Sequence, residues 1–188
     1  GLLAVAATRG SGTVGEDITA NVRRIANVPT RIKYSGAVEL RGEVYMPLST
    51  FENLKGDFAN PRNTTAGALK QKNADRSESM GLRFFVYDVI GPEFGTELEK
   101  YEWASRFGLS PVEHRLVGRS QVQSGYDEYV ARRDKLDFEI DGVVFKANRL
   151  EEQERLGATA HHPRYSIAYK LQGESAVTTL ESVEWSVS

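Results

Sequence analysis

The chain contains no cysteine and is poor in methionine and proline, with two and six of these among its 188 residues. Without thiols it can form neither disulfides nor thiolate metal sites. No apolar run approaches the roughly 20 residues that a membrane-spanning helix requires, and the first residues lack the pattern of a signal peptide. We therefore expect a cytoplasmic protein that does not enter a membrane.

The charge balance excludes little. The formal net charge is −2, which gives no global sign of nucleic-acid binding but leaves room for a local basic groove. Hydrophobic residues make up 40% of the chain and charged residues 27%, which is typical of a globular protein with a buried core. The length fits one domain, or one domain and the start of another.

Alternation of apolar and polar residues predicts strands, and a helical apolar period predicts amphipathic helices. The predicted strands are 2–7, 38–46, 82–89, 112–117, 138–146, 165–171 and 176–187, and the predicted helices are 16–25, 47–54, 63–70, 96–107, 120–136 and 150–157. Gly42 falls on the apolar face of its strand, which indicates close packing or a β-bulge. Asn63 and Ser120 are predicted N-caps, and Gly108 is predicted to follow the end of a helix.

Residues 138–146 read FEIDGVVFK and combine a strand pattern with an Asp-Gly turn signal. Asp141 at the turn and Lys146 at the strand end could both reach one anionic ligand and its metal. That interpretation needs the turn at Gly142, because a regular strand would put the two side chains on opposite faces. The alternative is a hairpin with a solvated lysine.

Basic side chains mark two further stretches. Arg9 stands where the first predicted strand enters a loop with three glycines, and such loops can present backbone N–H groups to phosphate. Arg62 precedes a predicted helix start, where backbone donors favour anions, and it forms a basic patch with Lys70 and Lys72. A surface arginine and a solvated helix end are the corresponding alternatives.

Two strand residues suggest a ligand cleft. Tyr87 lies in an aromatic strand and either packs in the core or stacks on a nucleobase. Lys170 lies on a strand face with Ser166 and Ala168, and a lysine among small residues suggests a cleft rather than open solvent.

These segments occur together in one known family. The motifs ATRGSGTVGED, ELRGEV, FANPRNTTAGALKQ, FFVYDV, EIDGVVFK and AYK follow one another along the sequence. In this order the chain closely resembles the adenylation (nucleotidyltransferase) domain of bacterial NAD-dependent DNA ligases. The resemblance implies an α+β nucleotidyltransferase fold, similar to ATP-grasp folds, with antiparallel sheets flanked by helices.

The resemblance also implies a reaction and a nucleotide site. In this family a lysine attacks the α-phosphate of NAD and retains AMP, which then passes to the 5′-phosphate of a DNA nick before the 3′-hydroxyl displaces it. By resemblance, Lys170 would contact the α-phosphate. Lys146 would lie against adenine with its amine towards the phosphate, and Tyr87 would stack on the other side of the base. Glu43 would bind the ribose, and Arg9 would approach the nucleotide from the rim.

The remaining implied roles concern metal and DNA. Asp141 would help to organise the lysines and an assisting Mg²⁺ ion. Arg62, Lys70 and Arg133 match positions that serve the DNA-bound steps, although Lys70 replaces an arginine found in many members and cannot make its bidentate contact. The expected partners are NAD and nicked duplex DNA, and the expected parent is a monomeric enzyme of the bacterial cytoplasm, associated with the nucleoid.

The nucleophilic lysine of the family lies in a K-x-D-G motif that should precede Leu3, and the 188 residues contain no such motif. We therefore expect a fragment that supplies most of the AMP pocket without adenylating itself. Residues 1–173 would form the adenylation domain, and residues 174–188 would begin an oligonucleotide-binding fold. Zinc is expected only in a later, C-terminal module.

Two alternatives stay open from the residues. One is a non-catalytic nucleotide- or nucleic-acid-binding module that kept the pocket. The other is an ATP-dependent ligase or capping-type nucleotidyltransferase, which the motifs ATRG and ANPRN disfavour because they resemble the NAD-dependent branch.

Overall fold

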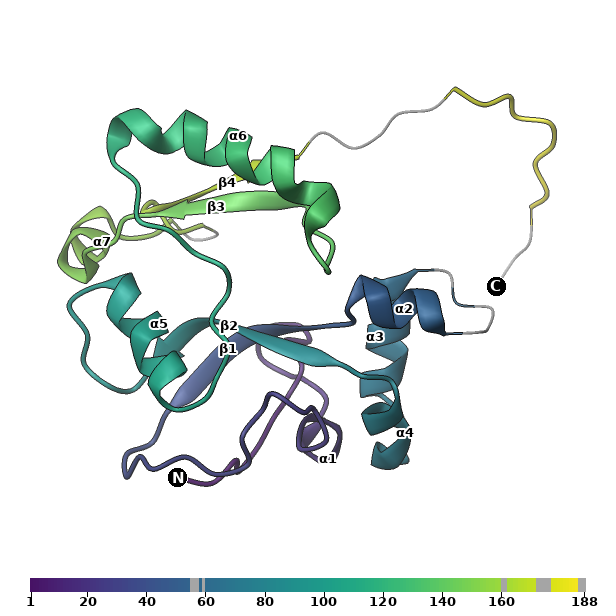
Figure 1. Cartoon of the computed structure of the whole chain (residues 1–188), viewed down its shortest axis with the longest axis horizontal. Helices are drawn as coiled ribbons and strands as arrows, with labels where there is room; N and C mark the ends of the chain where they lie inside the picture. Colours follow the sequence, from purple (N-terminus) through teal and green to yellow (C-terminus); the bar gives the residue numbers. More distant parts are fainter. Residues whose placement is uncertain (55–57, 59, 160–161, 172–176, 186–188) are drawn as a thin grey trace.

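Two small antiparallel sheets with helices around them form the fold (Figure 1). The computed structural model describes residues 1–54, 58, 60–159, 162–171 and 177–185. Strands β1 (Glu39–Tyr45) and β2 (Arg83–Ile90) form one sheet, and β3 (Gly142–Lys146) and β4 (Ser166–Lys170) form the other. The helices are α1 (Thr19–Val22), α2 (Leu48–Asn53), α3 (Pro61–Leu69), α4 (Ala74–Ser79), α5 (Glu97–Arg106), α6 (Val122–Arg132) and α7 (Leu150–Leu156), with 3₁₀ turns at Arg119–Gln121 and Arg133–Lys135. The α+β prediction is confirmed.

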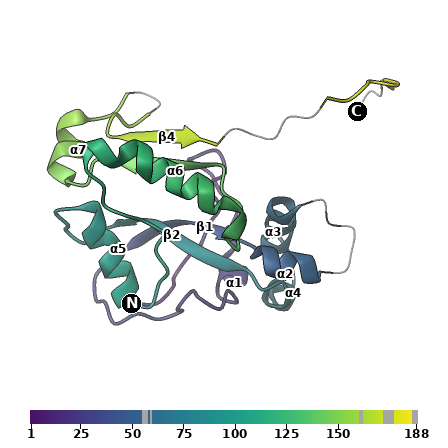
Figure 2. The same cartoon turned by 45° about the horizontal axis from the view of Figure 1, so that its top comes forward.

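The two sheets lie one over the other. Both views show β3–β4 on one side of β1–β2, with α1 on the opposite side of β1–β2 and α6 over the outer face of β3–β4 (Figures 1 and 2). The α6 contact is made by the ring of Tyr126, whose centroid lies 5.8 Å from that of Tyr169 on β4. The other face of β3–β4 is therefore turned toward β1–β2.

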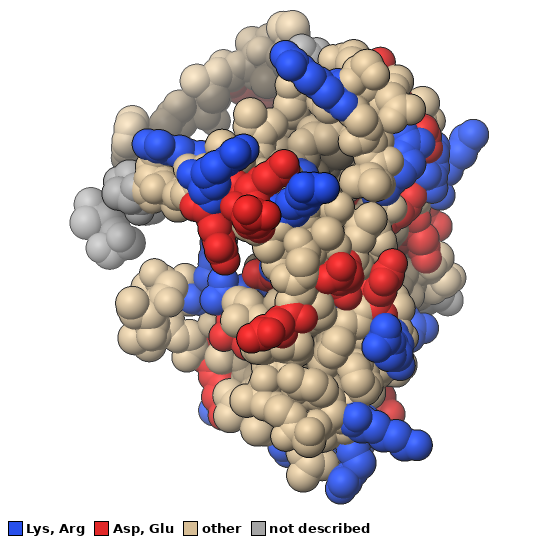
Figure 3. Space-filling model, turned by 90° about the vertical axis from the view of Figure 1, so that its left-hand side faces the viewer, with Lys and Arg blue, Asp and Glu red and all other residues tan. Residues whose placement is uncertain are grey.

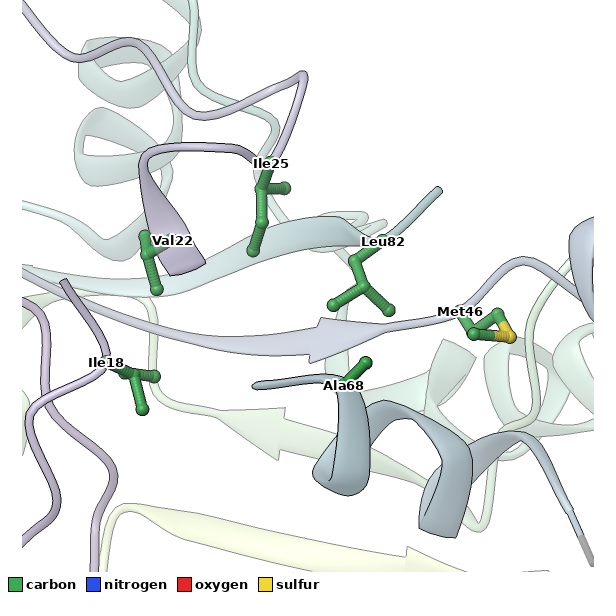
Figure 4. Close-up of a cluster of buried hydrophobic side chains, with 6 residues drawn as sticks. All are labelled: Ile18, Val22, Ile25, Met46, Ala68 and Leu82. Atoms are coloured by element: carbon green, nitrogen blue, oxygen red, sulfur yellow. The ribbon is translucent and has the colours of Figure 1, made fainter. Parts of the chain in front are cut away.

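Two apolar clusters hold the β1–β2 sheet. One is formed by Ile18, Val22, Ile25, Met46, Ala68 and Leu82, all at most 8% exposed (Figure 4). The other joins Val86 and Val89 of β2 to Trp103 and Ala104 of α5. Burial of apolar side chains is the main force that fixes an element, so β2 is anchored from both clusters.

The β1–β2 ladder carries the predicted bulge. Arg41 pairs with Asp88 but Gly42 pairs with Val86, so Tyr87 is an extra residue on β2. A Cβ on Gly42 would lie 2.0 Å from the backbone oxygen of Phe85 and 2.4 Å from the Phe84 ring. Only glycine allows this approach. The bulge turns two consecutive residues of β2, Tyr87 and Asp88, away from the core.

Two helix starts differ from the sequence prediction. The N-cap of α3 is Asn60, whose side chain accepts a hydrogen bond from the Asn63 backbone N–H at 2.8 Å. The prediction of Asn63 as the cap is wrong, because Pro61 takes the first helical position. Ser120 lies inside a 3₁₀ turn, and Gln121 stands at the N-cap position of α6. The predicted end of α5 is confirmed, since Gly108 follows its C-cap with φ of 78°.

Several predicted strands are absent. Residues 2–7 form only the isolated bridges of Leu2 and Ala7, and residues 138–140 and 112–117 belong to no strand. The predicted Asp-Gly hairpin is therefore wrong, and β3 pairs instead with β4. Helix α1 is shorter than the predicted 16–25. Residues 177–185 lie in no helix or strand, and the proposed boundary at 173/174 falls outside the described residues.

Within the described chain, no helix is long and apolar enough to cross a membrane.

We predict that Gly42→Ala destabilises the fold by about 2–4 kcal/mol, because the methyl group meets backbone that cannot move aside cheaply. Chemical denaturation would measure the change in unfolding free energy. Gly67→Ala is the matched control: Gly67 is an exposed glycine of α3 with no atom within 4 Å of an added Cβ. There the same substitution should stabilise the helix by about 0.5–1 kcal/mol. Equal effects at both sites would contradict the close approach at Gly42.

Candidate nucleotide site

Lys146 and Lys170 lie on the same face of the β3–β4 sheet. The register pairs Gly142 with Lys170, Val144 with Ala168, and Lys146 with Ser166. Directly opposed residues of an antiparallel pair share a face, and residues two apart along a strand share it too. The two amines therefore stand at opposite ends of one face whose middle carries only small side chains and Val144. This is the face turned away from α6 and toward β1–β2.

Asp141 precedes β3 and pairs with Lys170 across the end of the sheet. Its Oδ2 accepts a hydrogen bond from Lys170 Nζ at 2.7 Å, although both side chains are well exposed to solvent. The hydrogen bond from Lys170 lowers the pKa of the Asp141 carboxyl from its ordinary 3.8, and the charge of Arg62 adds to the effect. Because Asp141 lies before the strand, it reaches Lys170 and not Lys146.

Glu43 and Tyr87 come from the opposing sheet. Glu43 pairs with Phe85, on the face of β1–β2 opposite the α1 core. The same face carries Tyr45, and Phe138 packs on both aromatic rings, with centroids 5.0 Å from Phe85 and 5.6 Å from Tyr45. The segment leading to Asp141 is thus seated on this face, and the Glu43 side chain is exposed beside it.

At the bulge Tyr87 is 42% exposed, and its carbonyl faces the other sheet. That carbonyl accepts hydrogen bonds from Lys146 Nζ and from the Tyr101 hydroxyl, each at 3.4 Å. Burial raises the pKa of Tyr101 to about 12, so this hydroxyl stays protonated as a donor. Lys146 therefore crosses from β3 to β2, and its amine lies next to Tyr87.

Sequence comparison identifies the family of the chain. The family model described as "NAD-dependent DNA ligase adenylation domain" matches residues 1–174. The chain belongs to this family. It is 42% identical to a DNA ligase of Syntrophomonas wolfei and 40% identical to one of Marinobacter nauticus, each over 100% of the chain and 30% of the relative. A DNA ligase of Mesorhizobium japonicum is 38% identical, over 98% of the chain and 27% of its own length. The chain thus spans less than a third of these ligases.

In this adenylation domain, the residues that approach Lys146 include one that the sequence analysis missed. The Lys146 amine also lies 3.5 Å from Glu97 Oε2, and Glu97 is only 8% exposed. Glu97 stands in the first turn of α5, where an acidic residue is ordinary, so no sequence pattern indicates this contact.

Arg9 and Lys70 belong to a second, more open region of the domain. The loop 8–16 is closed by a hydrogen bond from Thr8 N to Glu16 O at 3.0 Å. Glu16 forms an ion pair of 3.0 Å with Lys70, the residue after α3. Together with Gly10 and neighbouring loop residues, Glu16 and Lys70 line a shallow hollow of about 470 Å³. The predicted phosphate-binding use of the glycine loop stays a prediction.

Arg62 and Arg133 are exposed side chains of separate elements, the first turn of α3 and the 3₁₀ turn after α6. The positive charge of Arg62 contributes to the lowered pKa of the Asp141 carboxyl. On the face shown in Figure 3, acidic and basic side chains are interspersed, and no broad surface of one sign appears there.

We predict that Asp141 titrates below 3.8 and that Lys170→Met raises its pKa back toward that value, because the main cause of the shift is removed. A depressed pKa stabilises the fold at pH values above 3.8, and this contribution is lost as the pH falls through the lowered pKa. NMR titration of the carboxyl carbon would measure the change, with exposed Lys33→Met as control. An unshifted Asp141 in the unaltered chain would contradict the pairing.

Proposed function

We propose that this chain forms the AMP-binding part of an NAD-dependent DNA ligase, which adenylates itself from NAD and seals nicks between 5′-phosphate and 3′-hydroxyl ends. The observation that carries the proposal is the shared face of Lys146 and Lys170, turned toward the sheet that holds Glu43 and Tyr87. Membership of the adenylation-domain family supports NAD as the nucleotide donor. The DNA ligases that the chain resembles support the nick as the acceptor.

Phosphoryl transfer depends on positioning and on neutralising charge at the phosphorus, which fits two amines on a rigid face. In the proposed complex Lys170 binds the α-phosphate. Lys146 and Tyr87 flank the adenine, Glu43 accepts hydrogen bonds from the ribose hydroxyls, and Arg9 lies at the rim. The attacking amine of the family belongs to a K-x-D-G motif outside these 188 residues. Its nitrogen would bond to phosphorus as the bond to nicotinamide mononucleotide breaks.

The proposed Mg²⁺ ion fits a sparse set of protein ligands. Among the described residues, no group of three or more His, Cys, Asp or Glu side chains is placed to hold a metal. Mg²⁺ commonly keeps several waters and binds through one or two carboxylates and substrate phosphates, so Asp141 alone suits it. When bound, the ion would offset negative charge on the phosphates, while Asp141 orients Lys170.

We expect a ligase that carries this chain to become labelled by adenine-labelled NAD and not by labelled ATP. Lys170→Ala should lower the labelling rate by roughly 10²–10³-fold, because it removes a charge that the transition state needs. Lys146→Ala should also lower the labelling rate, because the adenine loses one side of its binding site and is held less precisely. Lys33→Ala removes an exposed lysine elsewhere and should have no effect. Labelling by ATP would favour an ATP-dependent or capping-type enzyme, and binding without labelling would favour a non-catalytic module.

Arg62, Lys70 and Arg133 are proposed to contact DNA phosphates. Replacing each with Ala should reduce nick sealing more than labelling by NAD. Affinity for DNA falls as salt rises, and each variant should make this fall less steep, by about 0.9 in the slope of log affinity against log salt for each phosphate that it no longer neutralises. The measurement is binding to a nicked duplex over a salt series. Arg106→Ala, in the last turn of α5, is the control because Arg106 is exposed on a different element. Unchanged slopes in all three variants would remove them from the DNA interface.

A further inference from the structure

A cluster of partly buried charges surrounds the Lys146 amine, and its other members, Glu97, Lys100 and Asp88, have none of the roles above. Glu97 is its centre: Oε1 accepts hydrogen bonds from Gln153 Nε2 at 2.9 Å and Lys100 Nζ at 3.2 Å, and Oε2 faces Lys146. Lys100 also pairs with Asp88 at 2.8 Å. Burial alone lowers the pKa of Lys100, but Asp88 and Glu97 outweigh it and the pKa is raised.

The cluster joins elements from both sheets. Gln153 of α7 also donates to the Ala147 carbonyl at 2.7 Å, directly after β3, and the Glu97 backbone N–H donates to the Asn148 carbonyl at 2.8 Å. Two carboxylates, Asp88 and Glu97, face two amines, Lys100 and Lys146. A buried charge is tolerated when it is paired and hydrogen-bonded, so each member constrains the others.

We propose that Glu97 is a positioning residue for Lys146, an inference that rests on the proposed function. Glu97 and the Tyr87 carbonyl hold the Lys146 amine between them, at 3.5 and 3.4 Å. The amine thereby lies against the Tyr87 carbonyl of β2 while the Cα belongs to β3, so the aliphatic stem spans the space between the two sheets. In the proposed complex this stem is one wall of the adenine slot, and Glu97 sets the width of the slot.

Two effects of removing the Glu97 charge act in opposite directions. The stem loses its anchor, which weakens binding of the base, but the site becomes more positive, which strengthens binding of a phosphate. Adenosine carries no phosphate and reports only the first effect. We therefore expect Glu97→Gln to weaken adenosine binding about tenfold, the size of one hydrogen bond to a charged group. AMP binding should fall by a smaller factor.

A double-mutant cycle on the 188-residue chain tests whether Glu97 acts through Lys146. Lys146→Met keeps an apolar stem and removes the amine. In that background Glu97→Gln should change adenosine affinity, measured by NMR titration, by less than about twofold. Glu102→Gln makes the same charge change at an exposed position of α5 and is the matched control. An equal loss in both backgrounds, or no loss in either, overturns the positioning role.

A second measurement needs no nucleotide and guards against loss of folding. Acetylation rates of single lysines, read by mass spectrometry, should rise several-fold at Lys146 in Glu97→Gln, while exposed Lys170 stays unchanged as the internal reference. A Lys146 rate that does not rise, or a uniform rise at all lysines, overturns the proposal. If the unaltered chain binds neither AMP nor adenosine, the proposed function fails and the positioning role falls with it. Normal binding with an additive cycle overturns the positioning role alone.

Discussion

The close approach of Gly42 to β2 is the constraint from which the rest of the site follows. Because Gly42 has no side chain, the Phe85 carbonyl and Phe84 ring lie where a Cβ would stand, and the ladder shifts by one residue. The resulting bulge turns both Tyr87 and Asp88 away from the core. Tyr87 then offers its carbonyl to Lys146, and Asp88 holds Lys100 beside Glu97. The glycine at position 42 thus affects both the register of the β1–β2 ladder and the position of Lys146 on the other sheet.

The two site lysines differ in how firmly they are held. Lys170 is 69% exposed and pairs with an even more exposed Asp141, and solvent-exposed ion pairs contribute little to stability. Lys146 is 26% exposed and faces a nearly buried carboxylate within a hydrogen-bonded cluster. A competing anion can therefore take Lys170 from its partner at small cost, whereas moving Lys146 would leave the Glu97 carboxylate with one amine fewer in a water-poor environment.

The sequence predicted those parts whose cause is local. The alternation around Gly42 located β1 and its bulge, and Thr96 and Gly108 bounded α5. Prediction was wrong where contacts with distant residues determine the local structure. Phe138 lies in a segment that alternates like a strand, yet its ring packs on Phe85 and the residue belongs to no strand. The Glu97 cluster could not be predicted at all, because its contacts to Lys146 and Gln153 bridge 49 and 56 residues and leave no local pattern.

The difference between a held and a movable lysine suits the proposed chemistry. In the proposed reaction the group bonded to the α-phosphorus changes in the first two transfers, and AMP leaves in the third, while the adenine stays the same. A residue that flanks the base should therefore be fixed, since any looseness there would misalign every step. A residue that follows the phosphate should give up its ground-state partner easily, because it must favour the transition state over the resting ion pair. Lys146 is the fixed residue and Lys170 is the one that gives up its partner easily. The sequence shows a lysine at both positions and does not reveal this difference.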